Sequence, residues 1–265
     1  MPTLDDLLSR LWDDYTHLNP HAQRVRNLLR ERGETVVNDH IAFRTFDDPR
    51  IGINVLATAF EAHGYTPADS YTFPEKKLFA RHYEHPDANR PRVFISELKT
   101  EGFSEELRRS VKQLVDQVPV DRTEAWDFPV AGRLWDLSYE QYQSLAEESE
   151  YAGWLAAMGF RANHFTVFVN ALDTFESLEQ LNEFLKTQGF KLNDAGGEIK
   201  GSAEVLLEQS STRAEPVTVT FSDGEQKVPG CYYEFARRYA KADGQLFNGF
   251  VAKSADKIFQ STDRQ

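Results

Sequence analysis

The sequence predicts an α+β fold made of two units that share one order of elements. Each unit reads as a strand, a helix and then three or four further strands. The β-branched and aromatic residues of the two opening segments, Val36–Phe46 and Asn163–Val169, are typical of strands. Glycines close the helices that follow, at Gly64 and Gly189, as expected for helix ends. Identity between the two units is low, so the repeat rests on the pattern of elements.

The composition narrows the class of protein. The chain has 265 residues, of which 40% are hydrophobic, enough for a sizeable core. Its net charge of −12 argues against a nucleic-acid partner, because phosphate binding needs a basic face. The single cysteine excludes an internal disulfide, a zinc ribbon and an iron–sulfur cluster built from this chain alone. A metal site would therefore have to use histidines and carboxylates.

The first elements along the chain are two helices. Residues 3–18 form an amphipathic helix that Thr3 can cap, and residues 20–32 form a second helix with Pro20 in its first turn. Their apolar faces predict a helical cover, at about 3–33, that packs on a sheet. The first module follows at about 36–98. It opens with the strand at 36–46, continues with a helix at 52–63, and has strands at 71–73, 78–83 and 92–98.

A helical connector at about 104–160 separates the two modules. It begins with an amphipathic helix at 104–117, and residues 139–149 read as a further helix. We expect this connector to pack on the body of the protein, and we assign it no other role. The second module, at about 163–260, has a helix at 174–188 and strand candidates at 163–169, 190–192, 204–209, 217–221 and 231–239. The whole chain, 1–265, is thus predicted to be a single metal-binding catalytic domain.

Targeting and membrane signals are missing from the sequence. The acidic start, Met1–Asp14, lacks the cationic and apolar pattern of a signal peptide. No stretch approaches the roughly 20 apolar residues that span a bilayer. We therefore expect a cytoplasmic protein with no membrane partner, and the sequence assigns no oligomeric state.

Matched histidines stand near the start of the first strand of each module. Because side chains alternate along a strand, His40 shares a face with Ala42 and Arg44, and His164 shares a face with Thr166. The opposite faces of both strands are apolar and read as core. If the two modules pair about a pseudo-twofold axis, the two histidines converge.

A carboxylate within an aromatic strand is the candidate third ligand. Glu234 lies in Tyr232–Ala236, where an isolated charge is costly unless it is paired or bound to a metal. Two imidazoles and one carboxylate leave open positions on Fe(II), the arrangement of many non-haem oxygen-activating sites. The same ligands also suit Zn(II), Ni(II) or Mn(II), so they do not choose the metal.

Structural roles compete with these assignments. A single strand histidine is more often a hydrogen-bonded structural group, and Glu234 has Arg237 and Arg238 close by as ion-pair partners. The matched placement in both modules is what favours a shared site. His82 and His85 could also bind a metal, but their spacing puts them on opposite faces of a strand.

Two further residues are candidates for binding a substrate. Arg44 lies on the face of His40, and an inward guanidinium needs an anion such as a substrate carboxylate. The competing interpretation is a structural ion pair with Asp47, Asp48 or Glu234. Gln209 is a weaker candidate for the pocket.

Several of these segments together resemble the 2-oxoadipate dioxygenase/decarboxylase family. They are His40–Phe46, Asn163–Thr166, Tyr232–Ala236, Phe247–Phe250 and Ser254–Phe259. The resemblance spans about residues 3–262 and implies a relation to the vicinal-oxygen-chelate fold, whose paired βαβββ modules curl into a partly closed sheet around a metal. It also implies that His40, His164 and Glu234 are the metal ligands and that Arg44 binds the substrate carboxylate.

The resemblance implies an Fe(II)-dependent reaction in which O₂ and a 2-oxo acid give CO₂ and a shortened 2-hydroxy acid. For 2-oxoadipate the product would be 2-hydroxyglutarate, and His40, Arg44, His164 and Glu234 would be the catalytic residues. Two alternatives stay open on the sequence. One is a metal-dependent hydrolase, lyase or isomerase on the same scaffold, and the other is a non-catalytic module that binds a metal or a small acid.

Overall fold

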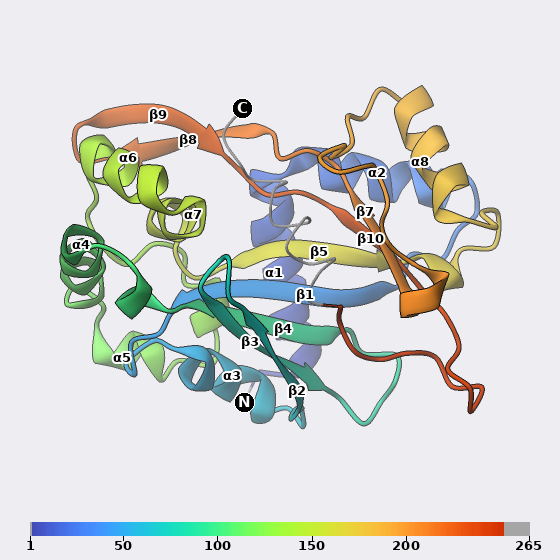
Figure 1. Cartoon of the computed structure of the whole chain (residues 1–265), viewed down its shortest axis with the longest axis horizontal. Coiled ribbons are helices and arrows are strands. Elements are labelled where there is room, and N and C mark those ends of the chain that lie inside the picture. Colours follow the sequence, from blue (N-terminus) through green and yellow to red (C-terminus); the bar gives the residue numbers. More distant parts are fainter. Residues whose placement is uncertain (1, 252–265) are drawn as a thin grey trace.

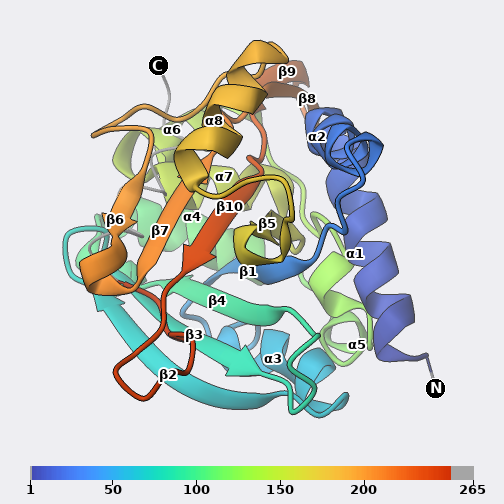
Figure 2. The same cartoon turned by 90° about the vertical axis from the view of Figure 1, so that its right-hand side faces the viewer.

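A strongly curved sheet of eight strands forms the body of the protein (Figures 1 and 2). The computed structural model describes residues 2–251, and the strand order across the sheet is β2-β3-β4-β1-β5-β10-β7-β6. Viewed along the strands, the sheet curls into a half-barrel, with α1, α2, α3 and α8 on its outer side (Figure 2). The predicted α+β class and the paired modules are confirmed.

The first module forms one half of this sheet. Its elements are β1 (Asn38–Phe46), α3 (Ile53–Glu61), β2 (Thr66–Phe73), β3 (Leu78–Glu84) and β4 (Arg92–Leu98). Strand β1 pairs parallel with β4, while β2, β3 and β4 form an antiparallel meander. The fully buried side chains of Leu56 and Phe60 fix α3 against the sheet.

The second module repeats this plan from the other side of β1. Its strands in the main sheet are β5 (Ala162–Phe168), β6 (Lys200–Ser202), β7 (Leu207–Ser211) and β10 (Glu234–Arg238), and its helix is α8 (Leu178–Thr187). Strand β5 pairs parallel with β10, as β1 does with β4. The two modules join where β1 pairs antiparallel with β5, at the middle of the sheet. Both opening strands are thus central, so their side chains lie in the deepest part of the curve.

Helices outside the two modules complete the core. They are α1 (Leu4–Leu18), α2 (Pro20–Glu31), α4 (Glu105–Val115), α5 (Val120–Thr123), α6 (Tyr139–Glu148) and α7 (Glu150–Met158). Thr3 and Asp6 form a capping box at α1, and Leu7, Leu11 and Tyr15 are buried, as the apolar stripe predicts. The connector does pack on the body, and its predicted helix at 139–149 is followed by α7, which begins at Glu150 because the Ser149 side chain caps it.

Several predicted strands of the second module are wrong or shifted. Residues 190–192 contribute only a bridge from Leu192 to Thr212 within the described chain. Residues 203–205 form a 3₁₀ turn, and the strand begins at Leu207 after Leu206 takes a left-handed conformation (φ 65°). The segment at 231–239 is a strand over Glu234–Arg238 alone.

Residues 217–221 are a strand, but in a different sheet. They lie in β8 (Pro216–Phe221), which pairs with β9 (Gly224–Pro229) as a separate two-stranded hairpin. Alternate residues of β8 are exposed, so this strand lacks the apolar faces of a central strand. Its last residue, Phe221, packs against Tyr139 and Tyr142 of α6, which fixes the hairpin over the connector (Figure 1).

Two predictions extend past the described residues. The end of the second module at residue 260, and the resemblance over Ser254–Phe259, lie outside residues 2–251. Across the described part of the chain, no helix is both long enough and apolar enough to cross a membrane.

Candidate metal centre

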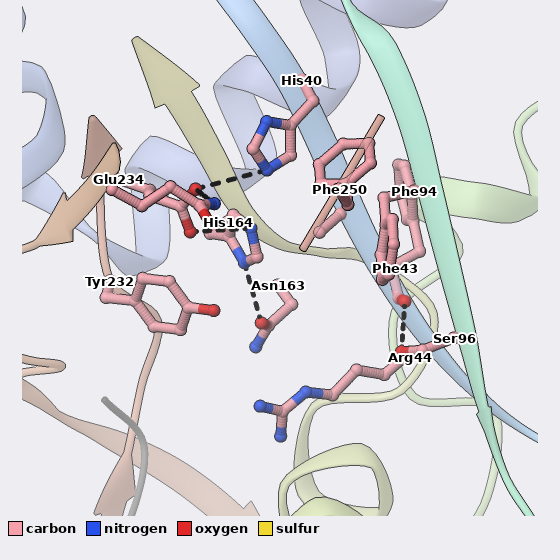
Figure 3. Close-up of a pocket in the computed structure, with 12 residues that line it drawn as sticks. His40, Phe43, Arg44, Phe94, Ser96, Asn163, His164, Tyr232, Glu234 and Phe250 are labelled. Atoms are coloured by element: carbon pink, nitrogen blue, oxygen red, sulfur yellow. Dashed lines mark hydrogen bonds and ion pairs between the residues drawn. The ribbon is translucent and has the colours of Figure 1, made fainter. Parts of the chain in front are cut away.

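The register of the three central strands brings the predicted ligands together. His40 of β1 lies opposite Thr166 of β5, and Thr166 lies opposite Glu234 of β10. His164 lies opposite Ala42, the next inward position of β1. The three residues therefore meet on the concave face at the junction of the two modules (Figure 3).

His40, His164 and Glu234 form a compact group of potential metal ligands. One donor atom from each residue lies within 4.8 Å of the other two. Nε2 of His40 lies 3.4 Å from Oε1 of Glu234, and Nε2 of His164 lies 3.4 Å from Oε2 of the same carboxylate. The two imidazole rings are nearly perpendicular, at 84°. All three residues are buried, so bulk water does not solvate the carboxylate.

Each histidine has a side-chain oxygen behind it, supplied by the preceding residue. Nδ1 of His40 lies 2.8 Å from Oδ1 of Asp39, and Nδ1 of His164 lies 3.1 Å from Oδ1 of Asn163. A proton on Nδ1 that is donated to these oxygens leaves the lone pair of Nε2 directed toward the carboxylate. This orientation of the imidazoles is the one usual for metal-binding histidines.

The electrostatics of the group favour a bound cation. Burial raises the pKa of Glu234 to about 8, although the hydrogen bond from Gln209 acts in the opposite direction. Burial also lowers the pKa of His40, and burial together with the charges of His40 and Arg44 lowers the pKa of His164 well below its usual value. A metal requires neutral imidazoles and a deprotonated carboxylate, so a bound cation would take the place of the proton that burial favours on Glu234.

An oxygen of Glu234 that lacks a hydrogen-bond partner also favours a bound cation. Among the described residues, Oε2 of Glu234 has no hydrogen-bond partner, while Oε1 accepts a 2.6 Å bond from Nε2 of Gln209. A buried carboxylate oxygen without a partner is costly. A divalent cation between the three side chains would remove this cost, and the donor set of two nitrogens and one carboxylate suits such an ion.

Arg44 points into the same pocket, as its strand face predicts (Figure 3). Its ion pair is formed with Glu150, at 2.9 Å between Nη1 and Oε1, a partner that the sequence analysis did not consider. The guanidinium also lies over the rings of Tyr151 and Trp154. Burial acts to lower the pKa of Arg44, but the charge and hydrogen bond of Glu150, together with Tyr232 and Tyr151, outweigh burial, so the pKa is raised. The connector thus supplies the surroundings of this arginine.

The pocket has a polar and an apolar side. Besides the residues discussed above, its lining includes Ala42, Phe43, Phe94, Ser96, Tyr232 and Phe250. Tyr232 stacks on His164 at 4.6 Å between ring centroids, and Phe250 meets His40 edge-on at 4.8 Å. No pattern in the sequence indicated Ser96 or Phe94, which come from the neighbouring strand β4. The sequence analysis quoted Phe250 and Tyr232 only as parts of motifs.

The competing histidines lie outside the group. His82 is fully buried on β3, where Nδ1 lies 2.9 Å from the Tyr71 hydroxyl and Nε2 lies 3.2 Å from Oε1 of Glu84. His85 contacts the carbonyl oxygen of His63 through Nε2. Both side chains therefore have hydrogen-bonding roles of their own.

Paired βαβββ modules with a buried group of potential ligands at their junction define the vicinal-oxygen-chelate fold. A glyoxalase-superfamily protein from Ralstonia eutropha, 22% identical, shares the fold with a TM-score of 0.73 and covers 92% of this chain and 84% of its own. The family model for 2-oxoadipate dioxygenase/decarboxylase matches residues 1–245. The chain belongs to this family, and the resemblance in the sequence is confirmed.

Relatives agree with this family. An Arabidopsis thaliana protein named chloroplastic 2-oxoadipate dioxygenase/decarboxylase is 36% identical over 97% of this chain and 76% of its own length. The Oryza sativa hydroxyglutarate synthase, solved with 2-oxoadipate, is 33% identical with a TM-score of 0.90, and the match covers 97% of this chain and 91% of that one. A Shewanella frigidimarina structure whose given name suggests a hydrolase is 51% identical with a TM-score of 0.90, over 94% and 97% of the two chains. The cytoplasmic location stays a prediction.

Replacing Glu234 by glutamine should change how the stability of the metal-free protein depends on pH. The pKa of Glu234 in the folded protein, about 8, exceeds its ordinary value of 4.5, so the folded state holds a proton that the unfolded state releases. Folding stability should therefore fall as pH rises between these values, by about 1.4 kcal/mol per pH unit from this group. Glu234→Gln removes that loss.

The measurement is urea unfolding of chelator-treated wild type and Glu234→Gln at about pH 5 and about pH 8. The variant should gain stability relative to wild type at the higher pH, while other titrating groups cancel in the difference. Parallel pH profiles would show that the carboxyl group of Glu234 titrates alike in the folded and unfolded states.

Proposed function

We propose that this chain converts a 2-oxo dicarboxylic acid of the 2-oxoadipate type and O₂ into CO₂ and a shortened 2-hydroxy acid. For 2-oxoadipate, C₆H₈O₅ plus O₂ gives 2-hydroxyglutarate, C₅H₈O₅, plus CO₂, so both oxygen atoms are used and no second reductant is needed. The observation that carries the proposal is the buried His40, His164 and Glu234 group in a chain of this family. The relative from Oryza sativa was solved with 2-oxoadipate.

His40, His164 and Glu234 are the proposed metal ligands, with Fe(II) as the native ion. These three side chains would hold the ion, and Fe(II), when bound, would supply the electrons that activate O₂. Zn(II), Ni(II) or Mn(II) fit the same donors and would occupy the site as substitutes. Because the ligands come from both modules, we also propose that the chain works as one catalytic domain.

The roles of the surrounding side chains follow from their positions. Arg44 is proposed to pair with a substrate carboxylate, since its guanidinium lines the pocket and stays charged. Gln209 lines the pocket and donates to Glu234, so it is proposed to hold the Glu234 carboxylate in place beside the substrate. Phe94 and Phe250 offer an apolar wall for the methylene chain of the substrate.

Substrate attraction is proposed to be local. The net charge of −12 does not favour the approach of a dianion at long range. Arg44 and the metal ion therefore have to supply the attraction at the site itself, where low solvent exposure strengthens it.

Reconstitution with Fe(II) under anaerobic conditions tests the reaction. After air is admitted, 2-oxoadipate should drive uptake of one O₂ for each CO₂ released, with 2-hydroxyglutarate as the product. Shorter and longer 2-oxo acids and a panel of esters serve as comparisons. Turnover without O₂ would favour a metal-dependent hydrolase, lyase or isomerase, and metal binding without turnover of any 2-oxo acid would favour a binding module.

Loss of a proposed ligand should remove the metal. His164→Ala deletes one of the imidazoles, and we expect the dialysed variant to retain no stoichiometric Co(II) or Fe(II), measured by elemental analysis. The matched control is His21→Ala, which removes another buried histidine, on α2, that contacts Thr212 instead. Full occupancy in His164→Ala would remove His164 from the proposed ligand set.

Substitution of Arg44 should separate substrate binding from metal binding. Arg44→Ala is expected to keep the metal, because Arg44 is not a proposed ligand, but to lower kcat/KM for 2-oxoadipate roughly tenfold to a hundredfold, the usual effect of losing a charged hydrogen bond. The control is Arg50→Ala, which breaks surface ion pairs with Asp48 and Asp116. If both variants show unchanged kinetics, Arg44 is a structural partner of Glu150 and no more.

A further inference from the structure

Asp39 is a buried charge that lies directly behind one of the proposed metal ligands. Its Oδ1 lies 2.8 Å from Nδ1 of His40 and accepts a 2.8 Å bond from Nη2 of Arg238. Its Oδ2 accepts a 2.6 Å bond from Nε of Arg238, which makes the ion pair bidentate. Nη1 of Arg92 lies 3.6 Å from Oδ2. One carboxylate thus binds two arginines and one imidazole.

Both arginines also hold the segment at 247–250, which follows β10 and reaches the pocket. Nη1 of Arg238 donates to the carbonyl oxygens of Phe247 and Gly249, at 2.9 and 2.8 Å. Nη2 of Arg92 donates to Oδ1 of Asn248 at 2.6 Å. The bonds of Arg238 hold the backbone of this segment and the bond of Arg92 holds its Asn248 side chain, while the backbone N–H of Phe247 donates to the carbonyl oxygen of Tyr239 at 3.0 Å.

The far end of this segment covers the proposed ligand. Phe250 packs its ring edge-on against His40 and also contacts His82 and Phe94. The backbone N–H of Phe250 donates to the Tyr71 hydroxyl of β2 at 3.1 Å. The 247–250 segment therefore bridges the two halves of the sheet, and its Phe250 lies against His40 (Figure 3). Asp39 contacts the Nδ1 atom of the same imidazole.

The second histidine lacks such an arrangement. His164 has a neutral amide oxygen, from Asn163, at its Nδ1, and no ion pair is formed by this amide. A carboxylate behind a metal-binding imidazole fixes its orientation and raises its basicity more than a neutral acceptor does. The two proposed ligands thus have unequal partners at Nδ1, a buried carboxylate for His40 and a neutral amide for His164.

We propose that Asp39 is a positioning residue with two linked tasks: it orients His40 for metal binding, and through Arg238 and Arg92 it keeps the 247–250 segment closed over the pocket. This inference rests on the proposed function, because it takes His40 as a metal ligand. Altering Asp39 should therefore change both the binding of the metal and the closure of the 247–250 segment. Altering Arg238 or Asn248 should change the closure of the segment and leave metal binding as it is.

Co(II) binding and hydrogen exchange test both tasks without requiring turnover. Asp39→Asn should weaken Co(II) affinity by about tenfold to a hundredfold, the usual effect of losing a partner of a ligating histidine, and should shift the visible absorption of bound Co(II). In the same variant, the backbone amides of Phe247 and Phe250 should exchange faster with deuterium, because the arginines lose their anchor.

Variants at the other end of the network should give a split result. Arg238→Lys keeps a cation beside Asp39 but lacks the Nη1 group that donates to the carbonyl oxygens of Phe247 and Gly249. Asn248→Ala removes the acceptor of Arg92. Both variants should speed exchange at 247–250 while Co(II) affinity stays within about twofold of wild type, since the carboxylate behind His40 remains.

Two further variants separate a specific effect of Asp39 from a general loss of folding stability. Glu34→Gln alters another buried carboxylate, which accepts bonds from the backbone N–H groups of Asp173 and Thr174, and it should leave Co(II) affinity and spectrum unchanged. If Asp39→Asn fails to fold because Arg238 is left unpaired, the double variant Asp39→Asn/Arg238→Gln removes both charges and should fold with the same weakened Co(II) binding.

The outcomes are distinct. Co(II) affinity and spectrum equal to wild type in Asp39→Asn, or in the double variant, overturn the positioning of His40. Unchanged exchange at 247–250 in Asp39→Asn overturns the link to the cover. Either result leaves the proposed function standing if His164→Ala still loses its metal, whereas metal retention in His164→Ala contradicts the proposed function itself.

Discussion

The antiparallel pairing of β1 with β5 is the contact on which the rest of the molecule depends. It joins the two modules, and its register places His40, Thr166 and Glu234 in one row across three strands. A slip of one residue would turn every side chain of a strand to the opposite face, so His40 would enter the outer core and Ile41 would enter the pocket. The fully buried Ile41 and Phe165 on the outer face, packed under the helices, oppose such a slip. The packing of the apolar face thus sets the position of the polar one.

The pocket also shows how buried charges are arranged in a chain that is acidic overall. Arg44 pairs with Glu150, Arg238 pairs with Asp39, and Glu234 sits between two neutral imidazoles. Each buried charge is expensive alone and tolerable with a partner. Of these three carboxylates, Glu234 is the one that has no arginine at ion-pair distance among the described contacts. A metal cation bound by His40, His164 and Glu234 would supply the missing positive charge.

Much of the fold and of the candidate site could be predicted from local signals. The strand pattern gave both modules, and the matched histidines with one internal carboxylate gave the group at their junction, because alternation along a strand fixes which side chains share a face. Glu150 could not be found this way, since its contact with Arg44 joins a helix of the connector to β1 across a long stretch of chain. Phe94 and Ser96 enter the pocket because β4 pairs beside β1, a neighbour that sequence alone does not specify. Asp39 and Asn163 did carry a signal, as each directly precedes a matched histidine.

The position of the ligand group at the junction has a consequence for chain topology. His40 belongs to the first module, whereas His164 and Glu234 belong to the second, and all three lie far apart in the sequence. A metal held by them would act as a cross-link that closes two loops, one spanning most of the first module and the connector and the other spanning most of the second module. Such a link removes conformational entropy from the unfolded chain and adds its binding free energy to the folded one. Neither module carries the complete donor set, so an ion bound by all three side chains would report that both halves have folded and docked.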